Sequence, residues 1–251
     1  LIHCLRPTVH RLLRYTLALA FALLAHAAAS ASGLQVSPVT LTLQATQNAD
    51  GLWLSNTGDD VVHAQVRVYQ WSQEAGNEKL TPSRELLVSP PMVQLAPSER
   101  QLIRVIRTGV PAGAVENSYR VVIDELPVEM KEKKGLQLVL RYSVPIFIAA
   151  AGAQPAAPQL SWSLRREGSQ AVLEVANGGG MHAQLADLDF VDTAGKRTPV
   201  HAGLMGYVLP GANMRWPLKT PAEAFATGGV LETKINGNAT QEKIPPLQRV
   251  R

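Results

Sequence analysis

Hydrophobic and polar residues alternate with a period of two along the first half of the chain. The clearest alternating runs are LQVSPVTLTL, GLWLSN, VVHAQVRVYQW, RQLIRVIR and SYRVVIDEL. Successive side chains of a β-strand point to opposite faces of a sheet, so each run predicts a strand with one buried face. Turn residues, as in NTGDD and EAGNE, separate the runs. Short strands at this spacing are typical of an antiparallel β-sandwich.

A second set of alternating runs follows a break rich in alanine, glycine and proline, AAAGAQPAAP, at residues 149–158. These runs are LSWSLRR, AVLEVANGG, AQLADLDFVD, YVLPG and GVLETKING. A break of this composition is typical of an interdomain linker. The pattern therefore predicts an all-β protein with two immunoglobulin-like β-sandwich domains, residues 32–148 and 159–251, joined by a short linker.

The longest alternating row lies in KEKKGLQLVLRYSVPIFIAA, from Lys131 to Ala150. The apolar residues on one face of this extended segment are Leu136, Leu138, Leu140, Tyr142, Val144, Ile146 and Ile148. A typical strand has about five or six residues, so this row is long enough to run past its own sheet and leave apolar side chains uncovered. The alternative is that the whole row packs inside its own sandwich.

The amino terminus has the organisation of a secretory signal peptide. Arg6, Arg11 and Arg14 supply the basic start, YTLALAFALLA supplies the apolar run, and AAASAS supplies small residues for cleavage. The apolar run, of roughly ten residues, is short for a membrane span. We expect cleavage after Ala31, with Ala27 as the alternative, and an exported protein without stable membrane insertion.

Removal of residues 1–31 changes the charge balance. Lys and Arg fall from 24 to 21, because the leader holds three Arg, against 20 Asp and Glu. A net charge of about +1 gives no basic stripe for a nucleic-acid partner. The single cysteine, Cys4, also lies in this leader, so we expect the mature protein to be stabilised without disulfides.

Motifs of enzyme chemistry are missing from the sequence. It contains no GxSxG, no HExxH and no glycine-rich phosphate loop, and His63, His182 and His201 stand singly. The spacing of Asp187, Asp189 and Asp192 lacks the glycine and terminal glutamate of an EF-hand loop. We therefore expect no catalytic residues, no metal and no cofactor. The four tryptophans are expected in the core or in a cleft: Trp53, Trp71, Trp162 and Trp216.

The segment SPPMVQLAPSERQLIRVIR, Ser89 to Arg107, resembles periplasmic chaperones of the chaperone-usher pilus pathway. The features that carry the likeness are Pro90, Pro91, Pro97 and Arg104. The likeness continues through ENSYRVVIDELP, GLQLVLRYSVPIF, VANGGGMHAQLADLDF and YVLPG, and so covers nearly the whole mature chain. It implies a periplasmic chaperone that binds, folds and caps pilus subunits and delivers them to an outer-membrane usher.

Such chaperones lend one strand to a subunit that lacks its own final strand, and this donor-strand complementation is itself a known example of strand addition. The resemblance assigns the donor positions to Leu136, Leu138 and Leu140, which we call the donor row.

The sequence departs from better-known members of the family, which hold the subunit's terminal carboxylate with an Arg in the first strand and a Lys late in the donor strand. Here VSPVTLTL contains no basic residue, and the late donor position is Pro145. A buried carboxylate without a cation is costly, so another base is expected. The candidates are Arg120 first, then Arg104 and Arg141, a pattern that resembles the archaic branch. Arg104 has an alternative role, an ion pair with Glu116.

A pilus structural subunit or adhesin is the alternative function. Such proteins are also exported and immunoglobulin-like, and SGLQVSPVTLTL has the alternation expected of a subunit's amino-terminal extension. Two complete sets of strands and the Pro-Pro segment favour the chaperone.

Overall fold

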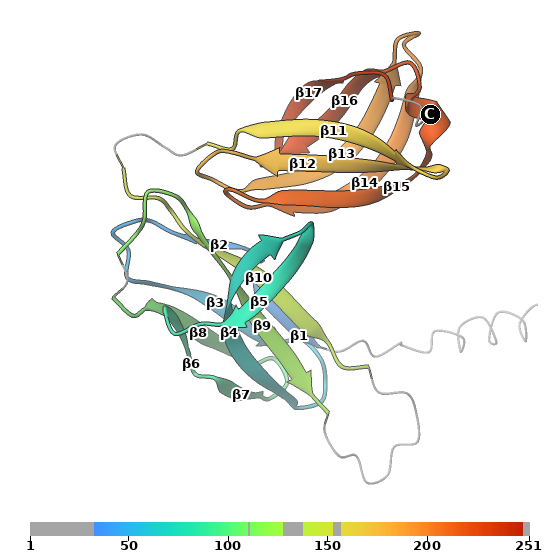
Figure 1. Ribbon diagram of the computed structural model, residues 1–251. Helices are drawn as coiled ribbons and strands as arrows, with labels where there is room; N and C mark the ends of the chain where they lie inside the picture. The colour runs from blue at the N-terminus through green and yellow to red at the C-terminus, as the bar shows by residue number, and fades with distance from the viewer. Residues whose placement is uncertain (1–32, 110, 128–137, 153–156, 248–251) are drawn as a thin grey trace, which may run out of the picture.

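The structure is a computed structural model, and it describes residues 33–109, 111–127, 138–152 and 157–247. Within these ranges the chain forms strands and one short 3-10 helix, η1 (Ala222–Phe225). Two pairs of facing sheets lie one after the other along the chain (Figure 1). The predicted fold class, all-β with two immunoglobulin-like sandwiches, is confirmed. The predicted signal peptide lies outside the described residues.

The first domain contains a four-stranded sheet facing a six-stranded sheet. The four-stranded sheet has the order β1 (Leu34–Ser37), β3 (Ala49–Asn56), β8 (Arg100–Arg107), β6 (Leu86–Ser89). The other has the order β2 (Leu41–Leu43), β10 (Arg141–Ile148), β9 (Asn117–Leu126), β4 (Val62–Glu74), β5 (Asn77–Pro82), with β7 (Met92–Leu95) also paired to β4. The β10–β2 pair is parallel and the other pairs are antiparallel.

The second domain has a three-stranded and a four-stranded antiparallel sheet. The first has the order β11 (Leu160–Glu167), β12 (Gln170–Asn177), β15 (Asn213–Pro221). The second has the order β14 (Arg197–Val208), β13 (Ala183–Asp192), β16 (Gly229–Ile235), β17 (Asn238–Ile244). Since β10 ends at Ile148 and β11 begins at Leu160, the segment expected as a linker lies between the two pairs of sheets.

Alternation in the sequence accounts for the core of the first domain. Leu52 and Leu54 of β3, and Ile103 and Val105 of β8, are fully buried between its sheets. Trp53 points the other way and is 38% exposed, with the guanidinium carbon of Arg100 4.1 Å from the centroid of its ring. The expectation that Trp53 is a core or cleft residue is therefore wrong, because it has the opposite parity to its buried neighbours in β3.

Two aromatic residues of the first domain pack into the hydrophobic core of the second. Trp71 of β4 and Phe147 of β10 are 3% and 1% exposed, and Trp71 makes an edge contact with Tyr207 of β14, with ring centroids 5.3 Å apart. The ring of Phe147 stacks on His182 with centroids 3.7 Å apart. Burial of large aromatic surface stabilises an interface strongly, so these contacts hold the two domains together.

Candidate functional site

Strand β10 has an edge that is only partly covered. On one side it pairs with β9 along its full length, whereas on the other side β2 pairs only with residues 146–148. In the described part of the chain, Arg141 to Pro145 therefore have no strand neighbour on the β2 side. The Glu125 N–H donates to the carbonyl of Leu140, so in this register even-numbered residues of β10 direct their backbone groups toward β9. Odd-numbered residues direct theirs to the open edge, which can accept another strand.

Pro145 fits this edge because of its parity. It lies opposite Arg120 in the β9 register, at a position whose backbone groups point away from β9. The N–H that proline lacks would have faced the β2 side, so the β9–β10 ladder is not interrupted. The hydroxyl of Thr40 reaches the carbonyl of Pro145 at 3.5 Å on that side.

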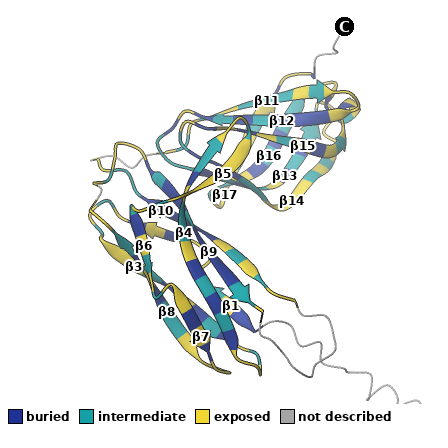
Figure 2. Ribbon diagram, turned by 60° about the horizontal axis from the view of Figure 1, so that its bottom comes forward, coloured by how far each residue is buried: buried dark blue, intermediate teal, exposed yellow. Residues whose placement is uncertain are grey.

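The long apolar row divides into a buried part and an exposed part. Val144, Ile146 and Ile148 are no more than 4% exposed and belong to the core of the first domain, whereas Leu138 is 67% exposed. Leu140 is partly buried. Packing inside the chain's own sandwich therefore explains the carboxyl-terminal half of the row but not Leu138. Burial along β10 is greatest in its carboxyl-terminal half, where residues 144–148 are all buried (Figure 2).

The strand begins later than the alternation predicts. It starts at Arg141, so Leu138 and Leu140 precede it, and Leu136 lies outside the described residues. Extending the β9 register places Leu138 opposite Pro127, which has no N–H to donate. Leu140 still accepts a hydrogen bond from the Glu125 N–H of β9, whereas Leu138 lies past Leu126, the last residue of β9, so the amino-terminal part of the row runs beyond its own sheet.

Arg120 lies between residues of the two domains, on the outer face of the six-stranded sheet. Its guanidinium carbon is 3.7 Å from the ring centroid of Trp71 and 5.4 Å from that of Tyr207 in the second domain. Only 11% of its side chain is exposed. Its Nη1 donates to the carbonyl of Ser143 at 3.3 Å, so the guanidinium extends over β10 toward the open edge.

The charge of Arg120 is weakly compensated. Its Nη2 lies 3.6 Å from Oε1 of Glu78, beyond ordinary hydrogen-bond distance. Burial lowers the pKa of Arg120 from its ordinary value, and the nearby Glu78 and Tyr207 oppose this effect. Arginine remains charged at neutral pH regardless, so the site presents a partly dehydrated cation with N–H donors suited to a carboxylate.

Arg141 already has a carboxylate partner. Its Nε contacts Asp124, and Nη2 of Arg67 lies 2.5 Å from the other oxygen of Asp124. Burial alone would raise the pKa of Asp124, but hydrogen bonds from Arg67 and Arg141 outweigh it and lower this pKa. Arg141 is therefore less available than Arg120 for an incoming anion.

Arg104 lies on the other sheet of the first domain. It is exposed on β8, opposite Gly51 of β3 and Ser89 of β6. The alternative role expected for it, an ion pair with Glu116, is wrong. Glu116 instead accepts a hydrogen bond from the backbone of His182 and lies 2.7 Å from its Nδ1, a contact between the domains.

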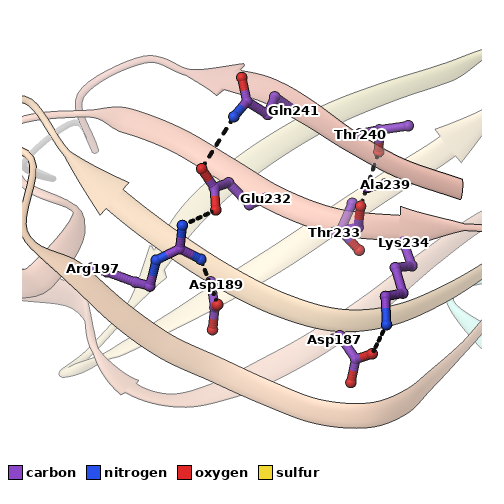
Figure 3. A pocket seen from close by; sticks show the side chains of 9 residues that line it. All are labelled: Asp187, Asp189, Arg197, Glu232, Thr233, Lys234, Ala239, Thr240 and Gln241. Atoms are coloured by element: carbon purple, nitrogen blue, oxygen red, sulfur yellow. Dashed lines mark hydrogen bonds and ion pairs between the residues drawn. The ribbon is translucent and has the colours of Figure 1, made fainter.

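A charged groove on the second domain is the other candidate site. It has a volume of about 590 Å³ and lies on the outer face of β13, β14, β16 and β17 (Figure 3). Arg197 bridges Asp189 and Glu232, and Lys234 pairs with Asp187 at 3.0 Å. These five charges are satisfied within the face itself, which is the ordinary state of a solvated sheet surface.

Two further observations concern the described residues only. No group of three or more potential metal ligands is found there. No helix in the same ranges is long and apolar enough to cross a membrane.

Residues 33–154 match the family described as "Pili and flagellar-assembly chaperone, PapD N-terminal domain". No curated protein matches the chain by sequence.

Many solved structures match across both domains. A chain of the archaic CsuC–CsuE chaperone–tip adhesion subunit complex of Acinetobacter baumannii is 23% identical, with a TM-score of 0.67 and coverage of 86% of this chain and 99% of that one. The YadV chaperone is 16% identical, with a TM-score of 0.61 and coverage of 84% of this chain and 99% of that one. A chain of the Salmonella enterica SafA pilin–SafB chaperone complex is 19% identical, with a TM-score of 0.60 and coverage of 89% of this chain and 99% of that one.

At these identities the structural matches establish the fold, and the family match identifies the first domain. Together they identify residues 33–154 as a PapD-type N-terminal domain of the pili and flagellar-assembly chaperones, and they support a pilus assembly chaperone for the chain as a whole.

Proposed function

We propose that the protein is a periplasmic chaperone that binds, folds and caps pilus subunits by donor-strand complementation and delivers them to an outer-membrane usher. The observation that carries this proposal is the exposed Leu138 in line with the buried row of β10, at the end of an open strand edge. The structural neighbours include complexes of chaperones with a pilin or a tip adhesion subunit, which supports a subunit as the partner.

The open edge and the apolar row supply two different parts of the binding energy. The outward-facing backbone groups of Arg141 and the N–H of Ser143 are available to pair with a subunit strand, and such bonds carry little sequence information. Leu138, and Leu140 in part, offer apolar surface to a subunit groove. Full burial of a leucine contributes about 1.5 to 3 kcal/mol, so the side chains decide how tightly a given subunit binds.

Arg120 is the proposed anchor for the subunit's terminal carboxylate. Its side chain is 11% exposed, and its guanidinium donates to the carbonyl of Ser143 at the open edge. Arg141 is engaged by Asp124, and Arg104 belongs to the opposite sheet. Of the three candidate arginines, only Arg120 combines an underpaired charge with a position next to the edge.

Co-purification tests the proposal. A tagged chaperone expressed with an exported pilus subunit from the same gene cluster should yield a soluble one-to-one complex. Arg120→Ala should lose the subunit while the free protein keeps its circular dichroism spectrum. Arg120→Lys should rescue capture only in part, because lysine cannot reproduce a planar two-pronged contact. Normal capture by Arg120→Ala would contradict the anchor, and unfolding of this variant would make Arg120 a structural residue.

The alternative, a pilus subunit or adhesin, requires a free strand to donate at the start of the mature chain. Leu34–Ser37 pair with β3, and Leu41–Leu43 pair with β10, so both parts of the expected extension belong to the sheets of this domain. This arrangement favours the chaperone. Isolation from polymerised fibres, rather than as a soluble complex, would support the alternative.

A further inference from the structure

The contact between Glu78 and Arg120 is loose compared with another ion pair on the same face of the sheet. Nη2 of Arg120 lies 3.6 Å from the Glu78 carboxylate, whereas Nη2 of Arg67 lies 2.5 Å from Asp124. The distance for Glu78 exceeds that of a charge-assisted hydrogen bond, about 2.7 to 2.9 Å. Glu78 therefore neutralises Arg120 at a distance and leaves donors of the guanidinium unused.

The two partners also differ in their access to water. The side chain of Glu78 is 46% exposed, and that of Arg120 is 11% exposed. A carboxylate that is almost half exposed can turn into solvent and recover its hydration at little cost. Arg120 has no such freedom, because its guanidinium is stacked on Trp71. Exchange of one carboxylate for another at Arg120 would therefore move Glu78 and leave the arginine in place.

The position of Glu78 is set by contacts between the domains. It lies on β5, opposite Gln73 of β4, and Gln73 donates to the carbonyl of Tyr207 at 2.8 Å and accepts from the N–H of Leu209 at 2.9 Å. The tip of this hairpin, at Gly76, forms a bridge with Met214 of the second domain. Figure 1 shows the β4–β5 hairpin reaching toward β15. The second domain thus holds the Glu78 backbone beside Arg120.

We propose that Glu78 is an internal competitor, a carboxylate that occupies Arg120 in the free protein and is displaced by the terminal carboxylate of a bound strand. This inference rests on the proposed function, since it assumes that Arg120 binds that group. The exchange avoids an uncompensated buried cation before the partner arrives, and it lowers the affinity for a terminal carboxylate, because that group must displace Glu78 from Arg120.

A peptide titration separates this role from the anchor itself. The probe is an acetylated peptide of two lysines followed by alternating threonine and valine, with either a free carboxylate or an amide at its carboxyl terminus. Its affinity is measured by calorimetry for the wild type, Glu78→Gln, Glu74→Gln and Arg120→Ala. Glu74 is the matched control, because it lies on the same hairpin but pairs with Lys79 at 3.0 Å.

We expect Glu78→Gln to bind the free-acid peptide about two- to five-fold more tightly than the wild type, the range for a weak exposed ion pair, with no change for the amide. Glu74→Gln should match the wild type with both peptides. An equal gain for acid and amide, or no gain for the acid, would overturn the role of Glu78 while leaving Arg120 as the anchor. Equal binding of acid and amide by the wild type, unchanged in Arg120→Ala, would overturn both proposals.

Discussion

Replacement of Leu138 by alanine should weaken subunit capture without unfolding the chaperone. The side chain is 67% exposed in the free protein, so about two thirds of the energy of burying a leucine remains to be gained on binding. With about 1.5 to 3 kcal/mol for complete burial, this amounts to about 1 to 2 kcal/mol, or roughly a five- to thirty-fold loss of affinity. Leu138→Asp should abolish capture, because it would place a charge in an apolar groove.

The assay is the amount of soluble subunit recovered with the tagged chaperone, together with urea unfolding of each free variant. Val139→Ala and Val139→Asp are the controls, because Val139 is 48% exposed and adjacent to Leu138 but has the opposite parity along the chain. The free energy of unfolding should change by less than about 0.5 kcal/mol in all four variants. Normal capture by a folded Leu138→Asp variant would refute donor-strand binding, and a variant that cannot fold would show that Leu138 belongs to the chaperone's own core.

Three further predictions concern the free protein. Trp71→Ala should lower the free energy of unfolding by about 3 to 5 kcal/mol in urea titration, because Trp71 is 3% exposed and packs into the core of the second domain; a loss below about 1 kcal/mol would contradict this packing. The pKa of Asp124 is lowered in the folded protein, so its ionised form stabilises the fold above the unfolded pKa of about 4, and this contribution is lost as pH falls through the folded pKa. Asp124→Asn should therefore lose less stability than the wild type below roughly pH 4. Identical acid titrations of the two proteins would argue against this role of Asp124. The melting temperature should be the same with and without reductant, because the sequence has one cysteine, and a shift with reductant would count against stabilisation by the core alone.

Most of the fold could be predicted from alternation because each strand of a sandwich has one buried face. Leu52 and Leu54, for example, fall on the core side of β3 as a period of two requires. Alternation does not indicate where strand pairing stops: the apolar row continues from Leu136 to Ile148, whereas β10 begins at Arg141. It also does not indicate which face meets the core when both faces carry large side chains, as the exposure of Trp53 shows.

The surroundings of Arg120 could not be predicted, because they come from segments far apart in the sequence. Trp71 and Glu78 lie on one hairpin, 49 and 42 residues before Arg120, and Tyr207 belongs to the other domain. The sequence does indicate that an arginine elsewhere must bind the carboxylate, because the first strand, VSPVTLTL, contains no basic residue. An ion pair of Arg104 with Glu116 requires both residues on one surface, but Arg104 lies on β8 of the four-stranded sheet and Glu116 contacts His182 of the second domain.

Amide hydrogen exchange of the chaperone, free and bound to a pilus subunit, tests donor-strand binding most directly. The register of β10 makes a residue-specific prediction, because the N–H groups of Arg141 and Ser143 point to the open edge and those of Tyr142 and Val144 point to β9. Binding of a subunit strand should slow exchange at Arg141 and Ser143 by at least about tenfold and leave Tyr142 and Val144, already protected by β9, nearly unchanged. Unchanged exchange at Arg141 and Ser143 in a stable complex would contradict the account, because the subunit would then bind elsewhere.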